Sequence, residues 1–270
     1  MAISDISLTA GMRNNLLALQ STASQVTTTQ NRLSSGKKVN SALDNPTNFF
    51  AAQAATNRAS DLNDRKDGMS EAVQTIQAAN SGISAITALI QSAKGLASAS
   101  AATNDTLQQA TYQTQFLAIT SQITTLASDS TYRGTNLLTA GTLSIEFSQK
   151  TGDSNLTING FKADATSLSI STANISSAAG ATSALTSMDT ALTSLRTQSS
   201  TLASNLSIIT TRQDFTNSMI NTLQTGADNL TLADMNQEGA NMLALQTRQS
   251  LGTTALSLSS QAAQSVLKLF

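Results

Sequence analysis

The chain of 270 residues contains no cysteine and no histidine. Their absence excludes disulfides, thiol catalysis, the common zinc sites and the most frequent general base. The carboxylates that are present form no convergent pair in a pocket-like context, so the sequence predicts no catalytic, cofactor-binding or metal site. We therefore do not expect an enzyme, and we expect no cofactor.

Charge is also scarce. Charged residues make up 11% of the chain and the formal net charge is -1, whereas soluble domains average about 25% charged residues. A nearly neutral chain has no general attraction for nucleic acid or anionic lipid, so nucleic acid is not an expected partner. Serine, threonine, asparagine and glutamine must provide the polar surface, and such a surface lets many identical copies pack without strong repulsion.

The chain has one proline, no tryptophan and only 3% aromatic residues. Its apolar residues are mostly leucine, isoleucine, valine and alanine, which suit thin seams between helices better than a compact interior. No apolar run approaches the roughly 20 residues of a membrane span, and Met1 to Asn15 lacks the pattern of a signal peptide. We therefore expect no membrane partner and a chain that is either cytoplasmic or exported without a cleaved signal.

Apolar residues recur at alternating steps of four and three, the spacing of a helix that packs along one stripe. These stripes predict a first helix from about Leu8 to Leu33 and a second that starts near Thr47, because Pro46 suits the first helical position. A third pattern covers Ala72–Ala97. Further helices are predicted over Tyr112–Leu126, Leu185–Leu230 and Asp234–Phe270.

Between Gly141 and Ile170 the apolar period changes to two, which is typical of strands. Asn159-Gly160 is a strong signal for a tight turn between strands, and Thr151-Gly152-Asp153 supports another. The following stretch, Ser171–Ser183, is rich in alanine and serine and is expected to be a linker. The predicted strands lie around Leu143–Phe147, Leu156–Ile158 and Leu168–Ile170.

These elements predict a mainly α-helical fold, with long antiparallel helices in a rod-like bundle or coiled coil and a small β-hairpin element inserted mid-chain. Three domains are expected. They are a terminal-helix domain of residues 1–40 with 235–270, a central helical bundle of residues 41–140 with 173–234, and a small β-hairpin element of residues 141–172.

Both ends of the chain have the pattern of buried helices. The last helix carries two apolar stripes, which one partner helix cannot cover. Burial along one seam contributes roughly 0.4 to 0.9 kcal/mol per residue, whereas ordering a residue costs about 1.5 kcal/mol. The terminal helices should therefore be poorly ordered until other copies cover them, and the sequence predicts a homopolymer. The residues predicted for self-assembly are Met12, Leu16, Leu19, Val26, Leu33, Met242, Leu245, Leu251, Leu256, Leu258, Val266, Leu269 and Phe270.

Several motifs resemble those of the bacterial flagellins. Leu33–Pro46 reads LSSGKKVNSALDNP, Thr131–Leu138 reads TYRGTNLL, and Asp67-Gly68 is followed by Ala72 and Gln74. Near the other end, the matching residues are Ala233-Asp234, Glu238, Gln249, Gly252-Thr253, Gln261 and Val266–Leu269.

The first of these motifs falls on the loop that connects the first two predicted helices. Leu43 stands where the family usually has lysine, and Asn45 where a second aspartate is common, so ion pairing in this loop is expected to be weaker. The connecting-loop residues are Ser35, Gly36, Lys37, Lys38, Asn40 and Asp44.

The resemblance implies a structural subunit of the bacterial flagellar filament, exported unfolded through a flagellar type III pathway and polymerised helically into the hollow extracellular propeller used for motility. The terminal helices would line the inner tube. The implied partners are further copies of the chain, an export chaperone or regulator, and the hook-associated and cap proteins. The chaperone would grip apolar residues of the last helix, namely Leu256, Leu258, Val266, Leu267 and Leu269.

Two alternatives stay open at this point. A hook-filament junction protein shares the terminal helices but forms only a short collar, and its abundance would distinguish it from a filament subunit. A cytoplasmic signalling coiled coil is also rich in alanine, serine, threonine and glutamine. The predicted β-hairpin and the lack of membrane spans disfavour that second alternative.

Overall fold

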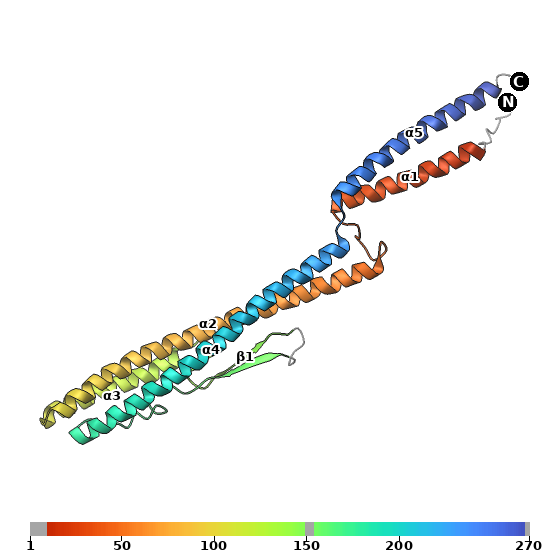
Figure 1. The fold of residues 1–270 in the computed structure, drawn as a ribbon. Coiled ribbons are helices and arrows are strands. Elements are labelled where there is room, and N and C mark those ends of the chain that lie inside the picture. Colours follow the sequence, from red (N-terminus) through yellow and green to blue (C-terminus); the bar gives the residue numbers. More distant parts are fainter. Residues whose placement is uncertain (1–9, 149–153, 268–270) are drawn as a thin grey trace. The chain divides into compact units, whose positions relative to one another are not determined.

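A computed structural model of the chain describes residues 10–148 and 154–267 (Figure 1). The described residues form five helices and one two-stranded sheet, which confirms the predicted mainly helical fold with a small hairpin. No helix among them is long and apolar enough to cross a membrane. In chain order the elements are α1 (Ala10–Ser35), α2 (Pro46–Ala102), α3 (Thr106–Asp129), β1 (Thr142–Glu146), β2 (Asn155–Asn159), α4 (Ala178–Thr231) and α5 (Met235–Leu267).

The chain divides into two compact units. The terminal unit contains residues 1–57 with 222–270, and the central unit contains residues 58–221. Helices α2 and α4 each contribute residues to both units. The three-domain division from the sequence stays a prediction, and the two units are described separately below.

Helix ends follow local chemistry that is visible in the sequence. Helix α1 stops before Gly36, which has a φ of +70° and donates its N–H to the Arg32 carbonyl at 2.8 Å. Helix α2 starts at Pro46, and the Asn45 side chain accepts the Asn48 N–H at 3.0 Å. The predicted start near Thr47 is therefore confirmed to within one residue.

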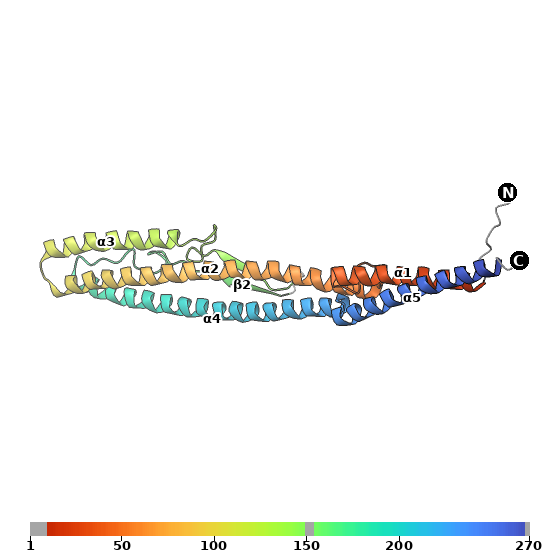
Figure 2. The same cartoon turned by 90° about the horizontal axis from the view of Figure 1, so that it is seen from above.

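The central unit has a continuous apolar core. Helices α2, α3 and α4 run side by side in both views (Figures 1 and 2). The stripe predicted over Ala72–Ala97 is buried at every step, because it faces the other two helices. The largest fully buried side chains include Ile76, Ile86 and Ile90 on α2, Phe116 and Ile123 on α3, and Met188 and Leu195 on α4.

The two strands pair antiparallel, with Leu143 opposite Ile158 and Ile145 opposite Leu156. Ile145 and Ile158 are buried and belong to the core of the central unit. The alternation of apolar and polar residues in these two segments therefore predicted the right strands, with one face of the hairpin on the core.

The predicted tight turn at Asn159-Gly160 is wrong. Strand β2 ends at Asn159, and the Gly160 N–H donates to the Gly141 carbonyl at 2.8 Å. A Cβ on Gly160 would lie 2.4 Å from the Leu137 carbonyl oxygen and 2.5 Å from that of Gly141. Glycine is present here because two backbone segments approach closely, and this need has the same sequence signature as a hairpin turn.

Two further expectations for this region need correction, and one lies outside the described residues. Leu168–Ile170 is not a strand, because the Ile170 N–H donates to the Ala165 carbonyl in a compact turn. The expected linker is shorter than Ser171–Ser183, since α4 already begins at Ala178, where alanine favours helix. The turn expected at Thr151-Gly152-Asp153 lies outside the residues that the structure describes.

Candidate assembly surface

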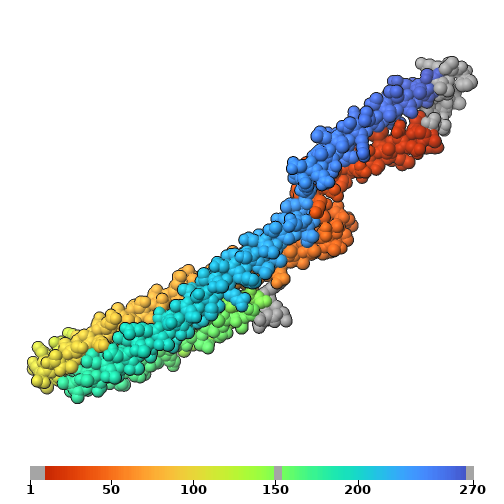
Figure 3. Space-filling view, in the orientation of Figure 1, coloured from red at the N-terminus to blue at the C-terminus, as the bar shows by residue number. Residues whose placement is uncertain are grey.

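Helices α1 and α5 lie side by side in the terminal unit (Figures 1 and 2). In the space-filling view the described parts of these two helices form two adjoining columns, and no other described element lies over the face that is seen (Figure 3). A pair of helices can bury only one stripe of each partner. The rest of each surface needs another cover if it is apolar.

The residues predicted for self-assembly are distributed over this pair in three classes. Met12 and Leu245 are buried between the helices at 8% exposure, and Leu16, Leu251 and Leu258 are exposed at 40%, 65% and 64%. The half-buried members are Leu19, Val26, Leu33, Met242 and Leu256. Val266 and Leu267 belong to α5, without a description of their side chains, and Leu269 and Phe270 lie outside the described residues.

Among its described residues, the terminal unit exposes more large apolar side chains than it buries. Its buried apolar residues, among those described, are Met12, Val39, Ala52, Ala227 and Leu245. Its exposed large apolar residues are Leu16, Leu17, Leu43, Phe50, Leu232, Met235, Leu243, Leu251 and Leu258. Of these nine residues, the sequence predicted Leu16, Leu251 and Leu258 for self-assembly and missed the other six. The spacing of Leu243, Leu251 and Leu258 by eight and seven residues is the signal that could have found Leu243.

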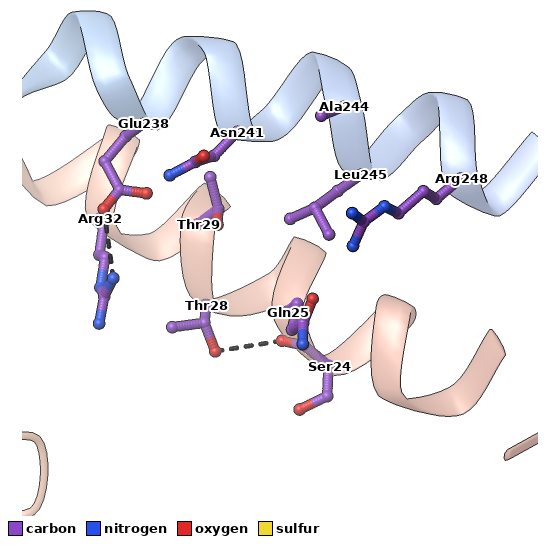
Figure 4. Close-up of a pocket in the computed structure, with 10 residues that line it drawn as sticks. All are labelled: Ser24, Gln25, Thr28, Thr29, Arg32, Glu238, Asn241, Ala244, Leu245 and Arg248. Atoms are coloured by element: carbon purple, nitrogen blue, oxygen red, sulfur yellow. Dashed lines mark hydrogen bonds and ion pairs between the residues drawn. The ribbon is translucent and has the colours of Figure 1, made fainter. Parts of the chain in front are cut away.

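A salt bridge fixes the register of α1 against α5. The Arg32 Nη1 donates to the Glu238 Oε1 at 3.2 Å, and the two side chains face each other between the helices (Figure 4). Glu238 is only 8% exposed, and its Oε2 accepts no hydrogen bond from any described residue. A buried carboxylate with a single donor is only partly compensated for its loss of water.

The same helices border an open groove of about 430 Å³ beside this salt bridge (Figure 4). Thr28 and Thr29 line it from α1, and Asn241, Leu245 and Arg248 line it from α5. Leu245 is the large apolar side chain of α5 that points toward α1 at this level. The contact between the helices is therefore thin here, and few apolar groups hold it.

The predicted connecting loop crosses from α1 to α2 and is bonded to the junction of α4 and α5. The Lys38 N–H donates to the Thr231 carbonyl at 2.8 Å, and the Ala233 N–H donates to the Gly36 carbonyl at 2.9 Å. The Lys38 ammonium also donates to the Asn229 carbonyl at 3.3 Å. The loop thus ties the first helix to the last one through backbone bonds that do not depend on the side-chain type.

Asp44 stabilises the part of this loop that leads into α2 by accepting hydrogen bonds. Its Oδ2 accepts the N–H groups of Asn40 at 3.0 Å and Ser41 at 2.9 Å and the Ser41 hydroxyl at 3.2 Å. Hydrogen bonds from the Ser41 and Asn40 backbones hold the pKa of the Asp44 carboxyl below its ordinary value. The Asn40 amide donates to the Lys37 carbonyl, and the Ser35 hydroxyl accepts the Lys37 N–H. Four of the six predicted loop residues, Ser35, Lys37, Asn40 and Asp44, therefore form one network, while Gly36 and Lys38 bond to the junction of α4 and α5.

Comparison with known proteins extends over nearly the whole chain. Residues 6–142 match the family described as bacterial flagellin N-terminal helical region, and residues 185–270 match the bacterial flagellin C-terminal helical region. The flagellin FljK of Caulobacter vibrioides is 29% identical over 274 residues and is covered completely, as is this chain. A flagellin of Brucella melitensis is 28% identical and covers 94% of this chain and 95% of its own length. A Bacillus cereus flagellin crystal structure is 20% identical, with a TM-score of 0.49 over 55% of this chain and 88% of its own.

Proposed function

This chain belongs to the bacterial flagellin family and is a structural subunit of the flagellar filament, and we propose that its terminal unit is the surface through which copies pack. As a flagellin it is exported from the cell and forms a homopolymeric filament that serves motility. It carries no large outer domain, because the two helical regions of the family account for all but residues 1–5 and 143–184.

One observation carries the proposal. The described part of the terminal unit buries five apolar side chains and exposes nine large ones. Each leucine that moves from water to a covered position contributes about 1.5 to 3 kcal/mol. Neighbouring copies are the partners that a homopolymer supplies at every subunit, so they are the natural cover for this surface.

The three-part division predicted from the sequence belongs to the same proposal. Residues 1–40 with 235–270 line the inner tube of the filament, and residues 41–140 with 173–234 form the next layer. The hairpin element of residues 141–172 takes the place of the large outer domains of longer flagellins. This division is supported by the location of the buried apolar residues, because the hydrophobic core lies in the central unit.

We propose further that the last helix is held during export by a chaperone or secretion regulator. Leu258 is 64% exposed and Leu256 is half-buried, so α5 offers apolar side chains that are not used within one copy. Val266, Leu267 and Leu269 would complete this handle. Hook-associated and cap proteins would contact the first and last subunits through the same terminal surface. Loss of chaperone binding in the Leu256→Ser/Leu258→Ser variant, with binding kept in Leu107→Ser, would support the handle.

Deletion of Val266–Phe270 tests the main proposal. We expect the truncated chain to form no filaments in electron micrographs, because it loses apolar residues at the end of α5. Circular dichroism of the truncated chain should retain most of the helical signal, since the central unit keeps its own core. Filaments of normal length and number from the truncated chain would contradict the proposal.

A further inference from the structure

A hollow of about 500 Å³ in the central unit brings two arginines together. Arg58 comes from α2 and Arg212 from α4. Phe147, which follows β1, and Phe215 on α4 line the same hollow. Within the described part of the chain, neither guanidinium forms an ion pair with a carboxylate.

Arg212 packs against an aromatic ring, and its guanidinium forms no ion pair with a described carboxylate. Its guanidinium carbon lies 5.2 Å from the centroid of the Phe147 ring, a cation–π contact. Phe147 is 9% exposed and belongs to the core of the central unit, so the ring is a fixed platform. Stacking of this kind leaves the N–H groups in the guanidinium plane available for an oxygen acceptor.

The acidic residue next to Phe147 in the sequence is already paired with another arginine. Glu146 precedes Phe147 and binds the Arg65 Nη1 at 2.7 Å. Arg133 is likewise paired with Glu71, and Lys94 with Asp189. Arg58 and Arg212 therefore differ from these paired cations, because they share one hollow in which no described carboxylate pairs with either of them. Two such cations give a positive potential that attracts an anion.

We propose that this hollow binds an oxyanion and that, in the filament, the oxyanion is supplied by Asp64 and Asp67 of a neighbouring copy. This step rests on the proposed function. All three glutamates of the chain already pair with arginines in the structure, which favours an aspartate as the complementary carboxylate. Asp64 and Asp67 are exposed, and their carboxylates have no bond to another described residue. They are three residues apart and so share one face of α2, where two carboxylates can meet two guanidinium groups.

The geometry of α2 makes this contact one between copies. Asp67 lies nine residues after Arg58, about two and a half helical turns, so the two residues point to opposite sides of the helix. One copy thus carries the cationic hollow on one side of α2 and the acidic pair on another. A head-to-tail contact between two different patches of one chain is the kind that propagates into a helical filament.

Filament stability in charge variants tests the inference. We expect Arg58→Gln, Arg212→Gln and the double variant Asp64→Asn/Asp67→Asn each to raise the critical concentration for assembly about tenfold, because each removes one side of a charge-assisted contact. The double variant Arg212→Asp/Asp67→Arg, which exchanges the charges, should assemble better than either of its single variants. The control is Arg196→Gln, an exposed arginine of α4 without an ion pair among the described residues, which should assemble like the native chain.

Two further readouts make the outcome decisive. Thermal unfolding of the unassembled variants must stay close to that of the native chain. The cation–π contact with the Phe147 ring is made by Arg212, so Arg58→Gln leaves that contact in place and tests the hollow even if Arg212→Gln unfolds. Inorganic phosphate added to the dilute native chain tests the free anion as a source. Phosphate binding that needs both arginines, with unchanged assembly of the aspartate variants, would overturn the neighbour's aspartates as the ligand. Native assembly by all variants and no phosphate binding would overturn the site. Failure of the native chain to polymerise at all would instead contradict the proposed function.

Discussion

At the scale of single residues, Glu238 shows how little holds the terminal helices together in one copy. The residue is 8% exposed, and among the described residues Arg32 alone donates a hydrogen bond to its carboxylate. Removing the arginine alone would leave a buried charge without a donor, whereas removing both partners would leave only apolar groups. The pair therefore specifies register more than it adds stability.

Arg32→Met and Arg32→Met/Glu238→Leu distinguish these two roles. The single variant should raise the critical concentration for assembly roughly fivefold, because the loss of about 1 kcal/mol is limited by solvent at the half-exposed guanidinium. The double variant should assemble nearly as well as the native chain. Sedimentation of filaments from unassembled chain measures both values, and a double variant weaker than the single one would refute this account of the pair.

Asp44 makes the connecting loop sensitive to acid. Its pKa is lowered by hydrogen bonds from Ser41 and Asn40, so its contribution to stability is present above the ordinary aspartate value of about 3.9 and is lost as pH falls through the lowered pKa. We expect Asp44→Asn to assemble less readily than the native chain at neutral pH. The ratio of the two critical concentrations should approach one in acid, and a ratio that does not change with pH would rule out this role for the carboxylate.

Residue chemistry in the sequence predicted some local features and missed others for a physical reason. Pro46 at a helix start and Gly36 at a helix end act through their own backbone geometry, so they can be recognised without a structure. Glycine is required at position 160 because the carbonyl oxygens of Leu137 and Gly141 leave no room for a Cβ. Only the folded chain brings these carbonyl groups near Gly160. The arginine pair of the hollow was missed in the same way, since 154 positions separate Arg58 from Arg212.

At the scale of elements, α5 is a helix with more apolar surface than its partner α1 can cover. Leu245 faces α1 and is buried, while Leu243, Leu251 and Leu258 are each more than 60% exposed. Residues at these spacings lie along one side of a helix. This side of α5 is the part of the proposed assembly surface that can be altered with least effect on a single copy.

Leu251→Ser/Leu258→Ser should therefore weaken assembly and leave the isolated chain unchanged. We expect a rise of at least tenfold in critical concentration, because each covered leucine contributes about 1.5 to 3 kcal/mol. Leu107→Ser, at an 80% exposed leucine of α3, is the matched control and should assemble normally. Equal assembly by the double variant and the control would show that this side of α5 is not covered in the filament.

The long helices were predictable because each repeats its pattern over many turns. The stripe over Ala72–Ala97 and the stripe over Leu185–Leu230 both fall within single helices, α2 and α4. The region from Gly141 to Ile170 was only partly predictable. Its strands have five residues each, and the same alternation also occurs at Leu168–Ile170, where backbone bonds to Ala165 form a turn instead.

At the scale of the whole molecule, the two units differ in what they can do alone. The central unit joins three helices and a hairpin around a core that includes twelve fully buried large side chains. The terminal unit has the pair α1 and α5, a bonded loop, one end of α2 and of α4, and five buried apolar residues among those that the structure describes. A unit with so little buried surface gains too little to offset the entropy of ordering its helices. The difference suits a subunit that folds in part before assembly and completes its folding in the filament.

Hydrogen exchange of the backbone amides tests this central claim most directly, because it reports the stability of each helix separately. In the dilute, unassembled chain we expect fast exchange along α1 and α5 and slow exchange in the core helices of the central unit. In assembled filaments both units should exchange slowly. If α1 and α5 of the dilute chain were protected as strongly as the central unit, the claim that neighbouring copies complete the terminal unit would be wrong.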